Sequence, residues 1–362
     1  MPLRFSSSRR SVSIPVSART RAVLPWSMCP AVPAIMFRIQ TILIVLLAFA
    51  AGSVAQTPPP VAPPPPQPVA DTDAPVLFRT GVADVRVVVQ VTEDGKTLKG
   101  LTKDDFVVTD QSVPQPVTFF AQEKEPLDLL LLLDISGSMR KHIEQMSETA
   151  RDALKYLSPG DRIAIMTFGV RTNVHFDFFD NHAEVARQLR TAVDDQERVG
   201  YGTAINSAVI DASKFIEAGN NAGRRSILMV TDNLGLNYKA NDEFTIGYLL
   251  KSDTVFNAIV IGRGIRPDRN RGKGYENPDF TPADVFRLAD ATGGEAVKAD
   301  HAAEFFPEMV ARIRDRYTIA YRVPEGAKPG QFRSISVALS PAALKLHPKA
   351  EVRARTGYYV KP

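Results

Sequence analysis

Residues 127–138 read LDLLLLLDISGS, and this stretch decides the fold class. Its five consecutive leucines, Leu129–Leu133, make both faces of the segment apolar. A short run of this kind is typical of a central strand in a parallel sheet, because such a strand is buried on both sides. The polar residues Asp134–Ser138 follow at once and predict a loop at the carboxyl end of that strand.

Strand-like and helix-like segments alternate from this stretch to about residue 316. Further short apolar runs predict buried strands at 163–168, 227–230, 255–261 and 296–297. Between them, apolar residues at helical spacing predict helices at 143–157, 181–194, 203–217, 283–291 and 302–313. This alternation predicts an α/β domain with a doubly wound, mostly parallel sheet that is covered by helices on both faces.

The chain is β-rich on both sides of the predicted α/β domain at 125–316. Valines alternate from Val85 to Val91 before a hairpin signal at Asp94-Gly95, and alternating patterns return at 317–323 and 352–359. The flanks, 76–124 and 317–362, are each too short for a comfortable core. We therefore expect them to join in a β-sandwich-like module beside the α/β domain.

Residues 1–55 have the composition of a presequence. They contain six arginines and no acidic residue, and the ten-residue apolar run 41–50 is followed by small residues at Ser53 and Ala55. This pattern predicts a signal peptide at 36–55 that is cleaved after Ala55, with translation starting at Met36 or at Met1. An uncleaved anchor is the alternative, although a membrane span needs about 20 apolar residues. We expect an exported protein, periplasmic, cell-surface or extracellular, without a stable transmembrane span after cleavage.

The charge of the whole chain, +4, reflects this presequence. Subtracting its six arginines from the 44 Lys and Arg leaves 38, against 40 Asp and Glu. The remaining chain is slightly acidic, which removes the argument for nucleic acid as a partner. The single cysteine, Cys29, excludes an intrachain disulfide framework and CxxC zinc sites. A proline-rich linker at 56–75 predicts a stiff spacer of polyproline II conformation.

Three polar segments are expected at the same edge of the predicted sheet. They are Asp134–Ser138 after the leucine strand, Gly200–Thr203 before a helix, and Thr231-Asp232 at the end of a later strand. Ligands bind at the carboxyl ends of the strands in open α/β sheets. The segments offer two carboxylates and three hydroxyls, a hard-oxygen set that suits one Mg²⁺ or Mn²⁺ ion. Gly137 and Gly202 are expected to allow tight turns.

These segments resemble the metal-ion-dependent adhesion site of the von Willebrand factor A (VWFA) domain, and the resemblance covers about residues 125–316. In that family, two serines and a threonine contact the metal, and two aspartates act directly or through water. An acidic side chain of a protein partner completes the metal shell. The resemblance assigns the metal-ligand roles to Asp134, Ser136, Ser138, Thr203 and Asp232.

The layout is also similar to bacterial secreted VWFA-related proteins, with GLTKDDF at 100–106 and RARTGYY at 353–359. Two positions depart from the family pattern. Asn233 stands where many members have glycine, and Met139–Lys141 replace the acidic pair that holds a second metal in integrin domains. We therefore expect one metal ion at this edge.

The sequence contains no HExxH, GxSxG or GxxxxGK motif, and its five histidines are scattered. A basic loop at 262–275 is expected at the metal edge, either as a cationic rim or as a solvated loop. We expect a secreted or envelope binding protein of adhesion type that contacts an exposed Asp or Glu of a partner through the metal, with no catalysis. The alternatives are a Mg²⁺-dependent hydrolase using Asp134 and Asp232, and an envelope scaffold with a vestigial metal site.

Overall fold

The computed structural model describes residues 84–122, 125–219, 223–235, 240–262 and 283–361. These residues belong to one compact unit, Val69–Pro362. The predicted signal peptide, the proline-rich linker and the basic loop after Gly262 lie outside the described residues. Within the described ranges, no helix is both long enough and apolar enough to cross a membrane.

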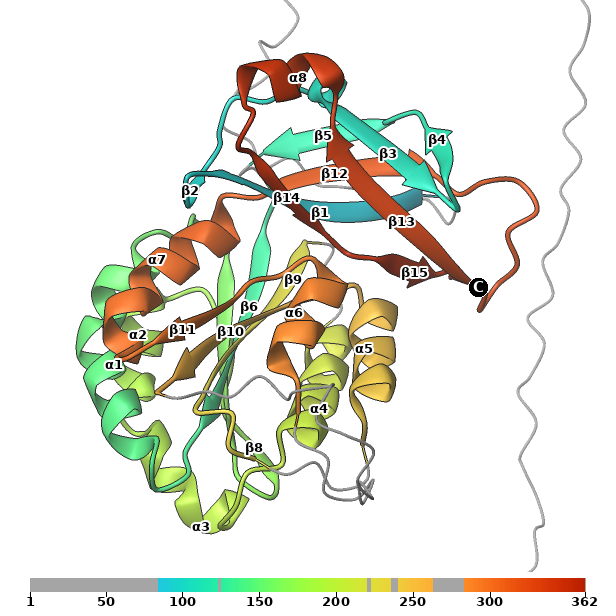
Figure 1. Cartoon of the computed structure of the whole chain (residues 1–362). Helices are drawn as coiled ribbons and strands as arrows, with labels where there is room; N and C mark the ends of the chain where they lie inside the picture. Colours follow the sequence, from blue (N-terminus) through green and yellow to red (C-terminus); the bar gives the residue numbers. More distant parts are fainter. Residues whose placement is uncertain (1–83, 123–124, 220–222, 236–239, 263–282, 362) are drawn as a thin grey trace, which may run out of the picture. The chain divides into compact units, whose positions relative to one another are not determined.

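A six-stranded sheet forms the centre of the α/β domain, in the order β11-β10-β9-β6-β7-β8 (Figure 1). Only the β7–β8 pair at one edge is antiparallel. The leucine run lies in β6, between β7 and β9, and is buried along its whole length. The strands are β6 (Leu127–Asp134), β7 (Arg162–Phe168), β8 (Thr172–Phe179), β9 (Arg224–Thr231), β10 (Thr254–Ile261) and β11 (Ala296–Ala299).

Helices cover both faces of this sheet (Figure 1). Alternate leucines of β6 face opposite sides. Leu129, Leu131 and Leu133 pack with α1, α2 and α7, whereas Leu130 and Leu132 pack with α4, α5 and α6. The helices are α1 (Arg140–Leu154), α2 (His182–Leu189), α3 (Gln196–Val199), α4 (Ile205–Ala218), α5 (Asp242–Lys251), α6 (Val285–Thr292) and α7 (Ala302–Arg314), with a 3₁₀ turn η2 (Ala192–Asp195).

Strands from the two flanks pair with one another in two further sheets, ordered β14-β1-β12-β5, with β2 beside β1, and β15-β13-β3-β4. Their apolar faces share one core, which includes Val87, Val89, Tyr317 and Tyr321. The predicted fold class is thus confirmed, whereas the exact domain boundaries remain predictions. The elements are β1 (Asp84–Glu93), β2 (Lys96–Thr97), η1 (Lys103–Asp105), β3 (Phe106–Asp110), β4 (Val113–Gln115), β5 (Phe119–Gln122), β12 (Tyr317–Arg322), β13 (Phe332–Leu339), α8 (Pro341–Leu346), β14 (Glu351–Ala354) and β15 (Gly357–Tyr359).

Two predicted elements are shorter than the sequence pattern indicated. The helix expected at 181–194 ends at Leu189, and the chain continues as the 3₁₀ turn η2, whose Asp195 side chain accepts hydrogen bonds from β7 and β8. The strand expected at 352–359 breaks at Arg355-Thr356. There Arg355 donates to Asp253, and the Thr356 amide donates to the Ala291 carbonyl. The two halves, β14 and β15, therefore join different sheets.

Candidate metal centre

Asp134 ends β6 with a fully buried carboxylate that is fixed by one neighbour in the loop after β6 and by another at the end of β9. Its Oδ1 accepts a hydrogen bond of 3.0 Å from the Ser136 amide. Its Oδ2 accepts one of 2.8 Å from the hydroxyl of Thr231, the last residue of β9. Because β6 and β9 are paired in parallel, both strands end at the same edge of the sheet.

Asp232 links the third predicted segment to the first. The Ser138 hydroxyl donates to Asp232 Oδ2 at 2.7 Å, and the two hydroxyl oxygens of Ser136 and Ser138 lie 3.3 Å apart. The Leu234 amide donates to Asp232 Oδ1 at 3.1 Å. Together with Asp134, these contacts bring four of the five predicted ligands into one hydrogen-bonded network.

Thr203 lies in a loop that packs between the end of β7 and the loop after β9. The Ala204 amide donates to the Gly169 carbonyl at 2.8 Å, which ties the loop to the end of β7. A Cβ atom added at Gly235 would lie 2.5 Å from the Thr203 carbonyl oxygen and 2.9 Å from its Cγ2. The loop after β9 is therefore in close contact with Thr203, so all three predicted segments meet at this edge.

The turn geometry singles out Gly202 and Asn233. Gly202 has φ of 112°, a conformation that strains any other residue, as the sequence predicted. Gly137 has no positive φ, and an added Cβ would meet nothing within 4 Å, so the expected need for glycine at 137 is wrong. Asn233 has φ of 55°, and asparagine tolerates this left-handed conformation better than most side chains. The departure at Asn233 therefore keeps the turn that glycine would also allow.

The Asp134 carboxylate lies in an environment that disfavours its negative charge. Burial raises the pKa of Asp134 to about 6, and the charge of Asp232 adds to the rise, while hydrogen bonds from Ser136 and Thr231 oppose it. Within the described ranges, no Lys, Arg or His forms an ion pair with either carboxylate. A bound cation would supply the missing positive charge, because a nearby opposite charge favours the ionised carboxylate.

The donor set fits a hard divalent cation. Two carboxylates and three hydroxyls provide oxygen ligands only, as Mg²⁺ and Mn²⁺ prefer. A different kind of site, built from three or more His, Cys, Asp or Glu side chains, does not occur among the described residues.

A buried polar network supports the loop that leads to Thr203, and no local sequence pattern indicated this network. Asp195 Oδ2 accepts hydrogen bonds from the Thr167 hydroxyl at 2.9 Å and from the side-chain amide nitrogen Nδ2 of Asn173 at 2.8 Å, and it lies 2.8 Å from His175 Nδ1. His175 Nε2 lies 3.0 Å from the Gln188 carbonyl. Both ring nitrogens of His175 are thus engaged in holding η2 against β8, which favours a structural role for this histidine.

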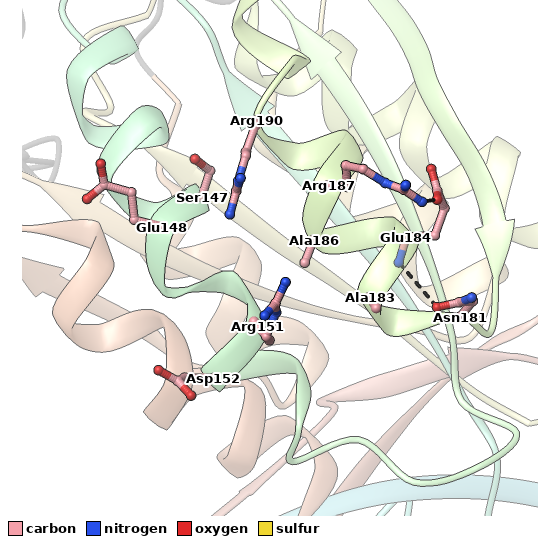
Figure 2. Close-up of a pocket in the computed structure, with 10 residues that line it drawn as sticks. All are labelled: Ser147, Glu148, Arg151, Asp152, Asn181, Ala183, Glu184, Ala186, Arg187 and Arg190. Atoms are coloured by element: carbon pink, nitrogen blue, oxygen red, sulfur yellow. Dashed lines mark hydrogen bonds and ion pairs between the residues drawn. The ribbon is translucent and has the colours of Figure 1, made fainter.

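A hollow of about 470 Å³ lies between α1 and α2, away from this edge, and is lined by residues of both helices (Figure 2). Two large apolar side chains are instead exposed beside the predicted ligands. Tyr201 is 83% exposed in the Thr203 loop, and Leu234 is 66% exposed two residues after Asp232. Neither side chain was predicted from the sequence to be part of a contact surface.

Comparison with known proteins gives a match over part of the chain. Residues 129–235 match the family model of the von Willebrand factor type A domain. This segment contains all five predicted metal ligands. No curated protein matches the chain.

Several solved structures are distantly similar. An aerotolerance-related membrane protein from Bacteroides fragilis, with multiple mutations to serine, has 14% identity and a TM-score of 0.39 over 52% of this chain and 98% of its own. A von Willebrand factor type A protein from Catenulispora acidiphila has 13% identity and a TM-score of 0.40 over 78% and 76%. Proximal thread matrix protein 1 from the mussel byssus, with zinc in its metal-ion-dependent adhesion site, has 14% identity and a TM-score of 0.40 over 56% and 49%.

Proposed function

This chain contains a von Willebrand factor type A domain, and from that premise we propose that it binds a protein partner through a divalent metal ion. The ion would be held by Asp134, Ser136, Ser138, Thr203 and Asp232, and would contact an exposed Asp or Glu of the partner. Mg²⁺ or Mn²⁺ is the ion that the ligand set favours.

The observation that carries this proposal is the network joining Asp134, Ser136, Ser138 and Asp232. It holds the ligand oxygens at one edge, and among the described residues no cationic side chain forms an ion pair with its two carboxylates. The three hydroxyl ligands are neutral and cancel none of the charge of a divalent ion. If one of the two carboxylates acts through a water molecule, its negative charge lies farther from the ion and compensates the ion's positive charge less. Such an ion retains attraction for a carboxylate from outside.

The surface beside the site supports a role in protein contact. Tyr201 and Leu234 are exposed on the loops that carry Thr203 and Asp232. Aromatic side chains are enriched among the residues that dominate binding energy at protein interfaces. A partner that presents an acidic residue next to an apolar one would match both the metal and these side chains.

The principal rival is a Mg²⁺-dependent hydrolase, which would need a general base beside the metal. His175 is engaged with Asp195 and with the Gln188 carbonyl, so its geometry serves the fold. We therefore propose a binding protein without catalytic turnover. Metal-dependent phosphatase or esterase activity that is lost in Asp134→Asn would contradict this part of the proposal.

The proposed setting is the cell envelope or the cell exterior, and the predicted signal peptide at 36–55 supports it. Mass spectrometry of the protein recovered from the exported fraction would test this point. A mature N-terminus at Gln56 is expected, and an N-terminus upstream of it would contradict the cleavage.

Metal binding is tested by isothermal titration calorimetry with Mg²⁺ and with Mn²⁺ on the wild-type chain and on Asp134→Asn. Binding of one ion to the wild type and a loss of at least tenfold in the variant are expected. Asp194→Asn, an exposed carboxylate on η2, is the matched control and should bind like the wild type. Equal binding by wild type and Asp134→Asn would reject the proposed site.

Partner binding is tested by capture from envelope extracts, followed by elution with EDTA. A partner released by EDTA and recovered on adding Mg²⁺ supports the metal-mediated contact. A partner that stays bound in EDTA, and binds equally well to Asp134→Asn, would favour the scaffold function instead.

A further inference from the structure

The groove between α1 and α2 brings two arginines together far from the metal centre. Arg151 extends from α1 and Arg190 from the end of α2, and both side chains reach into the same gap (Figure 2). Since an α-helix rises about 1.5 Å per residue, Arg151 lies about 16 Å along α1 from Arg140, where the helix leaves the metal loop. The groove is therefore separate from the proposed metal site.

These two guanidinium groups have no carboxylate partner among the described residues. The acidic side chains that line the groove are engaged or directed elsewhere. Glu184 forms an ion pair with Arg187 and accepts a hydrogen bond from Gln188. Asp152 pairs with Lys155, and Glu148 points away from the gap in Figure 2.

Two cations that face one gap repel each other unless an anion lies between them. A guanidinium group binds a carboxylate or phosphate with two parallel hydrogen bonds, which adds geometric specificity to the charge attraction. The groove has a volume of about 470 Å³, which is within the range of about 300–1,000 Å³ for sites that bind small molecules. It can therefore admit an oxyanion together with the group that carries it.

We propose that this groove binds an oxyanion, a phosphate or carboxylate group, held between Arg151 and Arg190. Arg187 does not take part, because Glu184 already neutralises it. The site is independent of the metal, so the proposal does not depend on the function proposed above.

The groove offers a matched set of variants for the test. Metal is first removed from the full chain with EDTA, and the EDTA is then dialysed away into metal-free buffer, because EDTA is itself a polycarboxylate. Binding of inorganic phosphate is measured by isothermal titration calorimetry at constant ionic strength, with chloride as the background anion. A triglutamate peptide, blocked at both ends, is the second probe, and the tighter of the two identifies the source of the oxyanion. The dialysed chain has been stripped of metal, so binding of a probe to it is distinct from binding at the metal centre.

Saturable binding of one probe to the wild type is expected, with a loss of at least tenfold in Arg151→Gln and in Arg190→Gln. Arg187→Gln should change the affinity less than twofold. Glu184→Gln should increase it several-fold, because it frees Arg187. All four side chains lie at the surface of the groove, and melting temperatures confirm that the variants fold. The absence of saturable binding of both probes, or binding that is unchanged in Arg151→Gln and Arg190→Gln, would overturn the proposal.

Discussion

The Ser138 hydroxyl donates a hydrogen bond of 2.7 Å to Asp232 Oδ2, and it joins two loops that are 94 residues apart in the sequence. One loop follows β6 and the other follows β9, and these strands are neighbours in the central sheet. The pairing of the strands therefore sets the position of the ligand oxygens. A site held in this way loses little conformational freedom when a ligand binds, which favours affinity.

The Asp134→Asn variant is expected to be more stable than the wild type in the absence of metal. Burial raises the pKa of Asp134 to about 6, against about 3.9 in an unfolded chain. At pH 7.5 the folded protein therefore holds a charge that its environment disfavours, at a cost of about 3 kcal/mol. Asparagine removes that charge, and urea denaturation in EDTA should show a gain of about 1–3 kcal/mol. Lower stability of Asp134→Asn under these conditions would contradict the origin of the shift.

The pH dependence of the metal-free wild type follows from the same raised pKa. Between about pH 4 and 6 the folded protein binds a proton at Asp134 that the unfolded chain does not. The contribution of this group to the free energy of unfolding should therefore increase as the pH falls from 7 towards 4. Metal affinity should change in the opposite direction and weaken about tenfold per unit below pH 6, because the proton competes with the metal. Denaturation and Mn²⁺ titration at several pH values, with Asp134→Asn as the reference, measure both effects.

The Gly235→Ala variant should weaken metal binding and destabilise the fold moderately. Its Cβ would lie 2.5 Å from the Thr203 carbonyl oxygen, so the Thr203 loop must shift. Mn²⁺ affinity is expected to fall at least fivefold, with a loss of about 1–3 kcal/mol in the free energy of unfolding. Gly137→Ala is the control, because it lies in the metal loop with nothing within 4 Å of the added Cβ. Equal affinities of the two variants would show that Thr203 is not a ligand.

The sequence predicts the central sheet well because its signal is local. β6 carries leucine at five successive positions because both of its faces are covered by helices. The Asp94-Gly95 pair predicts the turn of the β1–β2 hairpin, and the structure has this turn, with φ of 49° and 77° at the two residues. By contrast, β8 lies at the sheet edge with half-buried side chains, and its weak pattern predicts no strand. The sequence pattern also predicted no helix at α5.

In the candidate metal site, too, some residues could be predicted from local sequence patterns and others could not. Asp134, Ser138 and Asp232 could be named from their places at strand ends, since the carboxyl ends of parallel strands share one edge. The contacts that hold the site together could not be predicted in this way, because they join segments that are distant in the sequence. The approach of Gly235 to Thr203 and the exposure of Tyr201 result from the packing of three loops, which no local pattern encodes.

The Asp253→Asn variant should destabilise the protein strongly. Asp253 accepts hydrogen bonds from Arg86 at 3.1 Å and Arg355 at 2.7 Å, and both arginines are buried. Burial alone would raise the pKa of Asp253, but the charges of Arg355 and Arg86 outweigh it and lower that pKa. Removing the carboxylate takes away a charge that both buried arginines share, while Arg86 keeps its ion pair with Glu125 at 3.5 Å. The expected cost is about 3 kcal/mol.

Urea denaturation at pH 7 measures this cost, and Asp94→Asn is the control. Asp94 pairs with Lys349 at 3.2 Å on the surface, where such a pair contributes at most about 1 kcal/mol. Because the pKa of Asp253 is lowered, its contribution is present above about pH 4 and is lost as the pH falls below the folded-state value. The difference between wild type and Asp253→Asn should therefore narrow in acid. A difference of less than 1 kcal/mol at pH 7 would show that the two arginines find other partners.

The Tyr201→Ser and Leu234→Ser variants should separate partner binding from metal binding. Both side chains are exposed, so the free energy of unfolding should change by about 0.5 kcal/mol or less. Neither side chain belongs to the proposed ligand set, so Mn²⁺ affinity should equal that of the wild type. Affinity for a partner that EDTA releases should fall at least tenfold in each variant, since apolar contacts beside a charged contact exclude water from it. Tyr156→Ser is the control, because Tyr156 is 48% exposed just after α1, far from the loops of the metal centre. If Tyr201→Ser binds the partner as well as Tyr156→Ser does, the contact surface lies elsewhere on the domain.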